Sequence, residues 1–453
     1  MGPCCHPGNK KKTTAAGASS DSNNGGVKKR KDSAENEDQS RREDDDEDEE
    51  DEEEDSQDVN ESGSSVAKSL MHCLTKRIPE LIEYYGYKSE IHHVVTEDGY
   101  ILEIHRISGN QKHNSSRQDK PVVFLQHGLL TSSIDWVLAG PKKGLGFLLS
   151  DAGYDVWMGN SRGNIYSRYH ESMSPDRREF WEFDWHEMGL YDLPASIDYV
   201  LKQTHRQKLM YVGFSQGTTS YFVMTSSRPE YNDKVEAMFA LAPVAHCKGM
   251  FSPVMRFLAK MRKPLLYLMM GLRGEFKPTN YFFKRFGSLL CQSGSILQPV
   301  CVNSFLLIVG IDWTEFDTLL IRHILYQVPA GASIQQFMHY AHLISKGKSF
   351  ELFKKLFCQS LTVEFLAGGF QSMKGIEYNL KKVTSKVFLY HSKNDWLSSV
   401  SDVKRLSNVL PNLQKRFLVS YEYFNHIDFL WSKHVKELVY DKIMKDMSQI
   451  ISA

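Results

Sequence analysis

The feature that most constrains this chain is the pentapeptide Gly213-Phe214-Ser215-Gln216-Gly217, which directly follows the apolar run Leu209–Val212. A strand that ends in G-x-S-x-G and turns at once into a helix holds the serine on a strained turn. Its hydroxyl is then exposed at the carboxyl edge of a parallel sheet. We expect glycine at both outer positions because no side chain fits where such a turn doubles back on its neighbours. The pentapeptide alone is only moderately specific, since a turn of small residues also matches it by chance.

Two downstream loops supply partners for this serine. A serine hydroxyl is a weak nucleophile at neutral pH and needs a histidine base, which in turn needs an orienting acid. The strand-like run Lys386–His391 leads into a loop with Asp395, and the run Arg416–Tyr421 leads into a loop with His426. Serine, acid and histidine follow in this order in hydrolases whose nucleophile lies on such a turn. We therefore predict that Ser215, Asp395 and His426 are catalytic.

Asp428 is a second candidate for the acid. It lies two residues after His426, on the same loop. Because the sequence favours a helix from about Phe429, we expect Asp428 to cap that helix instead.

A loop upstream of the serine can provide an oxyanion hole. The buried strand expected over Pro121–Gln126 runs straight into His127-Gly128-Leu129-Leu130. In this kind of hydrolase, one backbone N–H comes from such a loop and the other from the residue after the nucleophile. The sequence therefore predicts an oxyanion hole formed by the amides of Leu129 and Gln216. The alternative is that His127-Gly128 is an ordinary turn.

Long stretches of the chain carry a family resemblance. They are Thr96–Leu102, Phe124–Leu130, Asp151–Gly163 (DAGYDVWMGNSRG), Tyr191–Ser196 and His426–Phe429. From about Leu81 to its C-terminus the chain resembles the acid lipase family of α/β-hydrolases, which includes lysosomal acid and gastric lipases. The resemblance implies hydrolysis of triacylglycerols or cholesteryl esters by Ser215, Asp395 and His426, with Leu129 and Gln216 at the oxyanion hole.

Two positions depart from the family pattern. Phe214 stands where these lipases usually have histidine, and Ser398-Ser399 stand where they usually have Ala-Asp. Neither is a triad position. The departures leave the pH optimum and the acyl preference open.

The order of expected elements indicates the fold class. A β-hairpin is expected over Ile91–Thr96 and Tyr100–Ile107. Apolar strands that alternate with helices then favour an α/β-hydrolase fold, a mostly parallel sheet with helices on both faces. The expected strands are 122–126, 154–158, 209–214, 235–241, 387–390 and 417–421, and the expected helices are 190–202, 216–226, 400–409 and 429–447.

The alternation stops between Val244 and about Gly375, a stretch rich in Phe, Leu, Met and Lys. Since the same sheet is expected to resume afterwards, we predict an inserted helical cap over the active site at about 244–375, within a lipase domain of residues 75–450. A separate helical domain is the alternative. The apolar and basic side chains of the insertion predict that part of it moves as a lid.

The first 65 residues differ from the rest in composition. Their large apolar side chains are Met1, Val27 and Val59, and they hold 9 Lys and Arg against 20 Asp and Glu. Such a segment buries too little apolar surface to offset its chain entropy, so we predict a disordered tail over 1–65. Glu43–Asp55 is an unbroken acidic run, which is usually a solvated segment.

The compartment stays open at this stage. The family implies a secreted or lysosomal protein, but no apolar signal segment is visible near Met1, so the alternatives are a cytoplasmic or lipid-associated protein and an atypical N-terminus. No apolar run is long enough for a transmembrane helix. Relatives carry a disulfide at the positions of Cys291 and Cys301, and two free thiols remain the alternative.

The leading hypothesis is a serine lipase or esterase that acts through an acyl-enzyme on lipid esters at a lipid–water interface, with membrane or lipid-droplet contact left open. A catalytically silent lipid-binding protein on a hydrolase scaffold is one alternative, and a thioesterase or peptidase is another. No metal-ligand spacing or phosphate loop is present, so we expect no cofactor, no metal and no nucleic-acid partner.

Overall fold

The computed structural model describes residues 77–110, 120–260, 274–276, 303, 306–312, 314–317, 320–346 and 377–452. The expected tail over 1–65, the Cys291–Cys301 pair and much of the expected cap lie outside the described residues. These predictions therefore remain predictions.

Within the described part of the chain, one nine-stranded sheet forms the centre of the folded body. Its order is β1 (Tyr87–Val95), β2 (Tyr100–Asn110), β4 (Asp155–Met158), β3 (Val122–Gln126), β6 (Leu209–Phe214), β7 (Val235–Leu241), β10 (Lys386–His391) and β11 (Leu413–Leu418), with β5 (Tyr169–His170) paired to β2. Neighbouring strands from β4 to β11 are parallel, and the hairpin β1–β2 joins β4 in antiparallel register. The mostly parallel sheet and the leading hairpin are as the sequence predicts.

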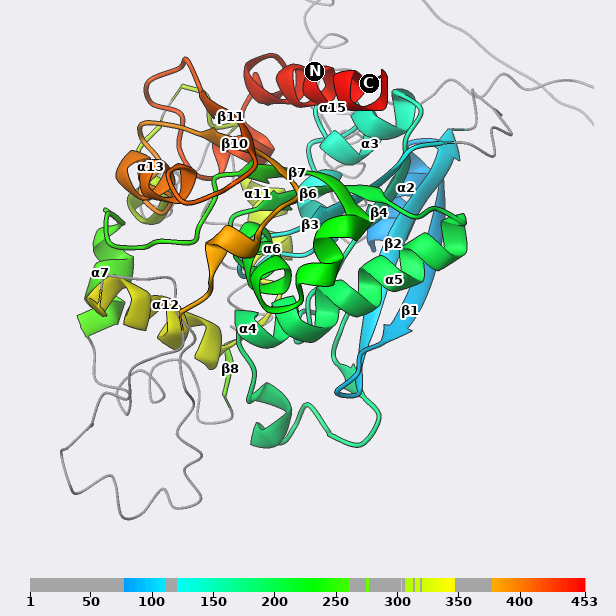
Figure 1. The fold of residues 1–453 in the computed structure, drawn as a ribbon, viewed down its shortest axis with the longest axis horizontal. Coiled ribbons are helices and arrows are strands. Elements are labelled where there is room, and N and C mark those ends of the chain that lie inside the picture. The colour runs from blue at the N-terminus through cyan, green and yellow to red at the C-terminus, as the bar shows by residue number, and fades with distance from the viewer. Residues whose placement is uncertain are drawn as a thin grey trace, which may run out of the picture. The chain divides into compact units, whose positions relative to one another are not determined.

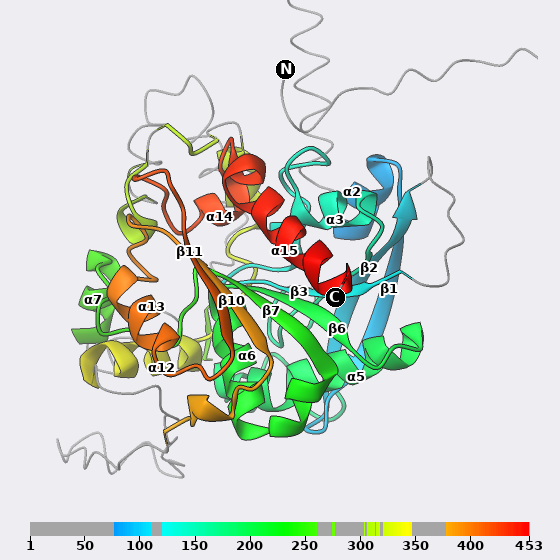
Figure 2. The same ribbon diagram turned by 45° about the horizontal axis from the view of Figure 1, so that its top comes forward.

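Helices cover both faces of this sheet (Figures 1 and 2). On one side lie α3 (Leu145–Asp151) and α15 (Asp441–Ser452), and on the other lie α5 (Leu193–Thr204) and α6 (Gln216–Ser227). The short α2 (Ile78–Tyr84) precedes β1. Two-sided cover is required because β3 and β6 are buried along their whole lengths.

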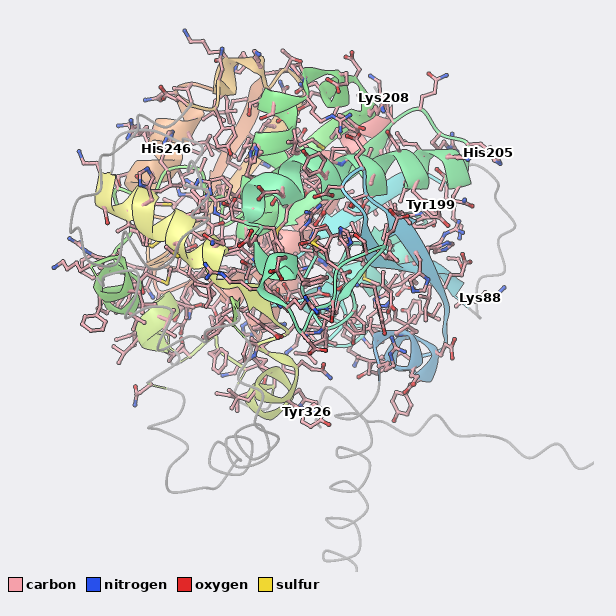
Figure 3. All side chains as sticks on the ribbon, turned by 90° about the horizontal axis from the view of Figure 1, so that it is seen from below. Lys88, Tyr199, His205, Lys208, His246 and Tyr326 are labelled. Atoms are coloured by element: carbon pink, nitrogen blue, oxygen red, sulfur yellow. The ribbon has the colours of Figure 1, made fainter. Side chains whose placement is uncertain are left out.

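The antiparallel end of the sheet is attached to a covering helix by a polar contact. His92 Nδ1 of β1 lies 3.0 Å from the Tyr199 hydroxyl of α5, and Tyr199 lies close to that strand in Figure 3. The α5 helix ends where His205 takes a left-handed backbone with φ 53°.

Two elements differ from expectation. The last strand is Leu413–Leu418 and not 417–421, because it is an edge strand with alternating exposure that includes polar residues. The helix expected over 429–447 is broken into α14 (Asp428–Trp431), a π-helical turn over Lys436–Tyr440, and α15. The break lies where Ser432 forms a β-bridge with Phe316, a tertiary contact that overrides the local helical pattern.

Between β7 and β10 the chain leaves the sheet and returns to it, as expected of an insertion. Its described parts include the helices α7 (Pro253–Lys260), α11 (Ile321–Gln327) and α12 (Ile334–Lys346). The strands β8 (Glu275–Phe276) and β9 (Ala332–Ser333) form a small antiparallel pair that the sequence did not predict. In the part of the chain that the structure describes, no helix is long and apolar enough to span a membrane.

Candidate active site

Ser215 lies on the sharp turn between β6 and α6, with φ 51° and ψ −114°. This strained backbone is possible because the glycines on either side of it allow close approach. A Cβ built on Gly217 would lie 2.4 Å from the carbonyl oxygen of Gln126, and one on Gly213 would lie 2.9 Å from the Tyr211 ring. The Ser215 amide donates to the carbonyl of Leu241 at 3.0 Å, which fixes the turn to β7.

The structure brings the three residues of the predicted triad together. His426 Nε2 lies 2.8 Å from Ser215 Oγ, and His426 Nδ1 lies 2.9 Å and 2.8 Å from the two carboxylate oxygens of Asp395. The amides of Leu397 and Ser398 donate to Asp395 Oδ1 at 2.9 Å and 2.7 Å, which holds the carboxylate in place. These contacts suit the tautomer in which Nδ1–H donates to Asp395 and Nε2 accepts from Ser215.

Asp428, the rival acid, faces away from the imidazole. Its Oδ2 accepts the Asn425 amide at 2.7 Å, and burial together with the nearby Asp312 carboxyl raises the pKa of Asp428 well above its usual range. The expectation that Asp428 caps the following helix is wrong. The amides of Ile427 and Asp428 donate instead to the side chain of Asn425, at 3.0 Å and 3.1 Å, because that side chain folds over the turn.

The loop expected to supply the first oxyanion donor lies against the nucleophile turn. A Cβ on Gly128 would come within 2.9 Å of the Phe214 ring and 3.3 Å of Ser215 Cβ. Within the described residues, the backbone N–H groups of Leu129 and Gln216 donate no hydrogen bond to another protein atom. Both donors are therefore available beside Ser215.

Two buried side chains support this loop. His127 Nδ1 lies 2.7 Å from the Gly128 carbonyl and His127 Nε2 accepts the Ser161 amide at 3.0 Å, while burial lowers the pKa of His127 to about 4. The imidazole is therefore neutral and its tautomer is set. Asp135 accepts from the Thr131 hydroxyl at 2.7 Å and from the Gly128 amide at 3.4 Å, and burial raises its pKa to about 7.

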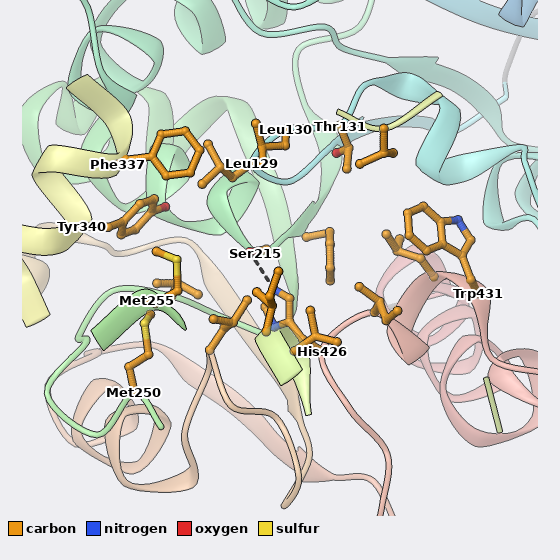
Figure 4. A pocket seen from close by; sticks show the side chains of 18 residues that line it. Leu129, Leu130, Thr131, Ser215, Met250, Met255, Phe337, Tyr340, His426 and Trp431 are labelled. Carbon is orange, nitrogen blue, oxygen red and sulfur yellow. Dashed lines mark hydrogen bonds between the residues drawn. The ribbon is translucent and has the colours of Figure 1, made fainter. Parts of the chain in front are cut away.

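Ser215 and His426 open on an apolar pocket of about 170 Å³ (Figure 4). Phe337 and Tyr340 of α12 lie on one side of Ser215, and Trp431 lies on the other. No local sequence signal marks these residues, because they come from elements far from Ser215 in the chain. The remaining lining is Leu129, Leu130, Thr131, Phe214, Val244, Met250, Met255, Ile308, Val309, Val328, Leu397, Ile427 and Leu430.

A second serine–histidine–acid contact lies elsewhere in the body. His105 lies 2.7 Å from Ser133 Oγ through Nδ1 and 2.8 Å from Glu103 through Nε2. Ser133 and His105 are completely buried and do not line the pocket, so no substrate reaches them. Among the residues that the structure describes, no cluster of His, Cys, Asp and Glu has a geometry that could hold a metal ion.

The sheet order and the serine on its turn after β6 define an α/β-hydrolase. Residues 121–276 match the alpha/beta hydrolase fold model, and residues 78–140 match the model of a partial alpha/beta-hydrolase lipase region. The solved structure of a putative lipase from Sulfolobus solfataricus shares this fold, with a TM-score of 0.53 at 11% identity over 80% of this chain and 95% of that one.

Curated relatives give the family. Lipase 3 of Drosophila melanogaster is 43% identical over 81% of this chain and 92% of that protein. Human gastric triacylglycerol lipase is 37% identical over 83% of this chain and 92% of that protein. Human lysosomal acid lipase/cholesteryl ester hydrolase is 37% identical over 82% of this chain and 90% of that protein. The chain belongs to the acid lipase family.

Proposed function

We propose that this protein is a serine lipase that hydrolyses the carboxylic ester bonds of neutral lipids through an acyl-enzyme. The observation that carries the proposal is the hydrogen-bonded series Asp395–His426–Ser215, which ends at an apolar pocket. In this arrangement Ser215 is the nucleophile, His426 the general base and Asp395 the residue that orients the imidazole.

The geometry supports a complete reaction cycle. Ser215 Oγ attacks the ester carbonyl carbon while its proton passes to His426 Nε2, and the amides of Leu129 and Gln216 donate to the oxyanion. As the tetrahedral intermediate collapses, His426 returns this proton to the leaving alcohol and the acyl group stays on Ser215. His426 then takes a proton from the water that attacks the acyl carbonyl, and it returns this proton to Ser215 Oγ as the fatty acid is released.

The pocket favours an acyl chain over a peptide. Its lining is almost entirely apolar, so a hydrocarbon chain loses no hydrogen bonds on entry, whereas a peptide backbone would. The names of the relatives point to triacylglycerols and cholesteryl esters as the substrate classes. A pocket of about 170 Å³ is smaller than the roughly 300–1,000 Å³ usual for ligand sites, so we expect a long acyl chain to extend beyond it.

Contact with a lipid surface is part of the proposal. Phe251 and Phe257 are 63% and 62% exposed, and no residue of α7 is buried. Arg256 and Lys260 on the same helix can meet anionic headgroups while their stems lie on apolar surface. We expect this part of the cap, predicted over 244–375, to lie on the lipid–water interface.

A lipid-binding protein without activity is the competing function. Incubation of the full chain with a fluorophosphonate probe, followed by mass spectrometry, separates the two. The lipase is labelled at Ser215 and hydrolyses emulsified triolein or cholesteryl oleate, and both properties are lost in Ser215→Ala. The control Ser133→Ala keeps both. An unlabelled wild-type chain that binds lipid without turnover would establish the silent protein, and faster hydrolysis of thioesters or peptides than of lipid esters would establish the other hydrolase activities.

A further inference from the structure

One segment of the insertion contacts both halves of the proposed oxyanion hole. We call Ala330–Gln336 the brace segment. At its start, the Ala330 amide donates to the carbonyl of Leu130 at 2.6 Å. At its end, Gln216 Nε2 donates to Gln336 Oε1 at 2.7 Å. Gln216 and Gln336 are both buried, with 3% and 2% of their surfaces exposed.

The first of these hydrogen bonds is made to a residue with a strained backbone, and the second is made by a residue next to one. Leu130 has φ 67°, a left-handed conformation that is unfavourable for leucine, and it follows the donor Leu129. Ser215 has φ 51°, and it precedes the donor Gln216. Strained conformations persist only where the surrounding contacts determine them fully. The positions of the two donors therefore depend on restraints at Leu130 and at Gln216, and the brace segment supplies one at each residue.

The Gln216 side chain has few other restraints. Besides Gln336, its Nε2 contacts the Met188 sulfur at 3.4 Å, and its Oε1 has no partner among the described residues. A thioether sulfur is a weak acceptor. The oxygen of Gln336 is thus the strong acceptor that fixes the side chain of the residue whose amide faces the oxyanion.

The brace segment is itself anchored to the hydrolase body. Ser333 Oγ donates to the carbonyl of Trp181 at 2.7 Å, and the Ile165 amide donates to the carbonyl of Ala330 at 2.8 Å. Ala332 and Ser333 also form the strand β9 beside β8. These contacts fix this part of the insertion to the body.

We propose that Gln336 is a positioning residue, which orients the oxyanion hole through the side chain of Gln216. The proposal rests on the function proposed above. It predicts that loss of the Gln336 acceptor slows the chemical step and leaves substrate binding nearly unchanged.

The test compares the full-length Gln336→Met and Gln336→Glu variants, with Gln203→Met as control, on a water-soluble 4-nitrophenyl ester of a short acid. Removal of a whole oxyanion donor costs about 10²–10³ in kcat, so loss of its positioning in Gln336→Met should cost about tenfold or more, with KM within about twofold. Gln336→Glu keeps an acceptor oxygen and should recover most of the rate. Gln203→Met makes the same substitution at an exposed position of α5 away from the pocket, so its kcat should stay close to the wild type.

A double variant distinguishes positioning from general stability. If Gln336 acts through Gln216, adding Gln336→Met to Gln216→Met should change kcat no further. An undiminished second loss of kcat, an unchanged kcat in Gln336→Met, or a change confined to KM would each overturn the proposal. If Gln336→Met does not fold, Gln336→Asn, which withdraws the acceptor by one methylene, carries the same expectations. A wild-type chain that neither hydrolyses esters nor reacts with fluorophosphonate would refute the lipase function itself, a separate outcome.

Discussion

The buried carboxyl of Asp135 should make this protein less stable as the pH rises from acid to neutral. Burial raises the pKa of Asp135 from its usual 3.8 to about 7. A folded carboxyl with a raised pKa binds a proton that the unfolded chain has already released. The contribution of the Asp135 carboxyl to the free energy of unfolding is therefore fully present below about pH 4 and is lost as the pH rises through 7. This pKa difference corresponds to on the order of 4 kcal/mol between pH 4 and pH 8.

Asp135→Asn tests this expectation because an amide cannot ionise. Its oxygen can still accept from Thr131 and Gly128, while its N–H₂ takes the place of Asp135 Oδ1, which has no partner among the described residues. The unpaired N–H₂ costs about 1–3 kcal/mol at every pH. The change of melting temperature with pH, and not its value at one pH, therefore tests the expectation.

Melting temperatures of the wild type, Asp135→Asn and Asp233→Asn should be measured from pH 4 to pH 8 at one scan rate. Asp233 is an exposed control whose carboxyl stays in water in both states. The wild type and Asp233→Asn should follow parallel profiles, whereas Asp135→Asn should gain melting temperature relative to both as the pH rises, because it lacks the contribution that they lose. Identical slopes for all three proteins would refute the reasoning.

Three further predictions concern the acid, the tail and the cap. Asp395→Asn should lower kcat by about 10⁴ because the imidazole loses its correct tautomer. The kcat of Asp428→Asn should stay within about tenfold of the wild type. If ester hydrolysis ranks the two variants the other way round, the acid is Asp428. Deletion of residues 1–65 should leave hydrolysis and melting temperature almost unchanged, and a fall of several degrees would mean that the acidic run stabilises the body. The rate against a rising concentration of short-chain ester should jump near the solubility limit and lose that jump in Phe257→Ser, while a smooth hyperbola through this limit in the wild type would argue against a lid.

The sequence predicted the elements whose signals are local. The strand before Ser215 and the helix after it lie where the pentapeptide places them, because the turn chemistry is contained in five residues. The loops with Asp395 and His426 could be found because each follows a strand-like run, although the strand before His426 lies over Leu413–Leu418.

The features that the sequence did not predict depend on contacts between distant parts of the chain. The helix after Asp428 is broken because Glu315 accepts hydrogen bonds from Ser432 and His434, more than a hundred residues away in sequence. Likewise, Gln336 lies 120 residues from Gln216, and nothing near either glutamine indicates that their side chains meet.

The central claim is that Ser215 carries the acyl group during turnover, and the most direct measurement is to trap that intermediate. The full-length chain would be quenched with acid during hydrolysis of a long-chain 4-nitrophenyl ester, digested, and examined by mass spectrometry. The mechanism predicts an acyl group on the peptide that contains Ser215, and neither adduct nor turnover in Ser215→Ala. Turnover that persists in Ser215→Ala, or an acyl group found on a different residue, would contradict it.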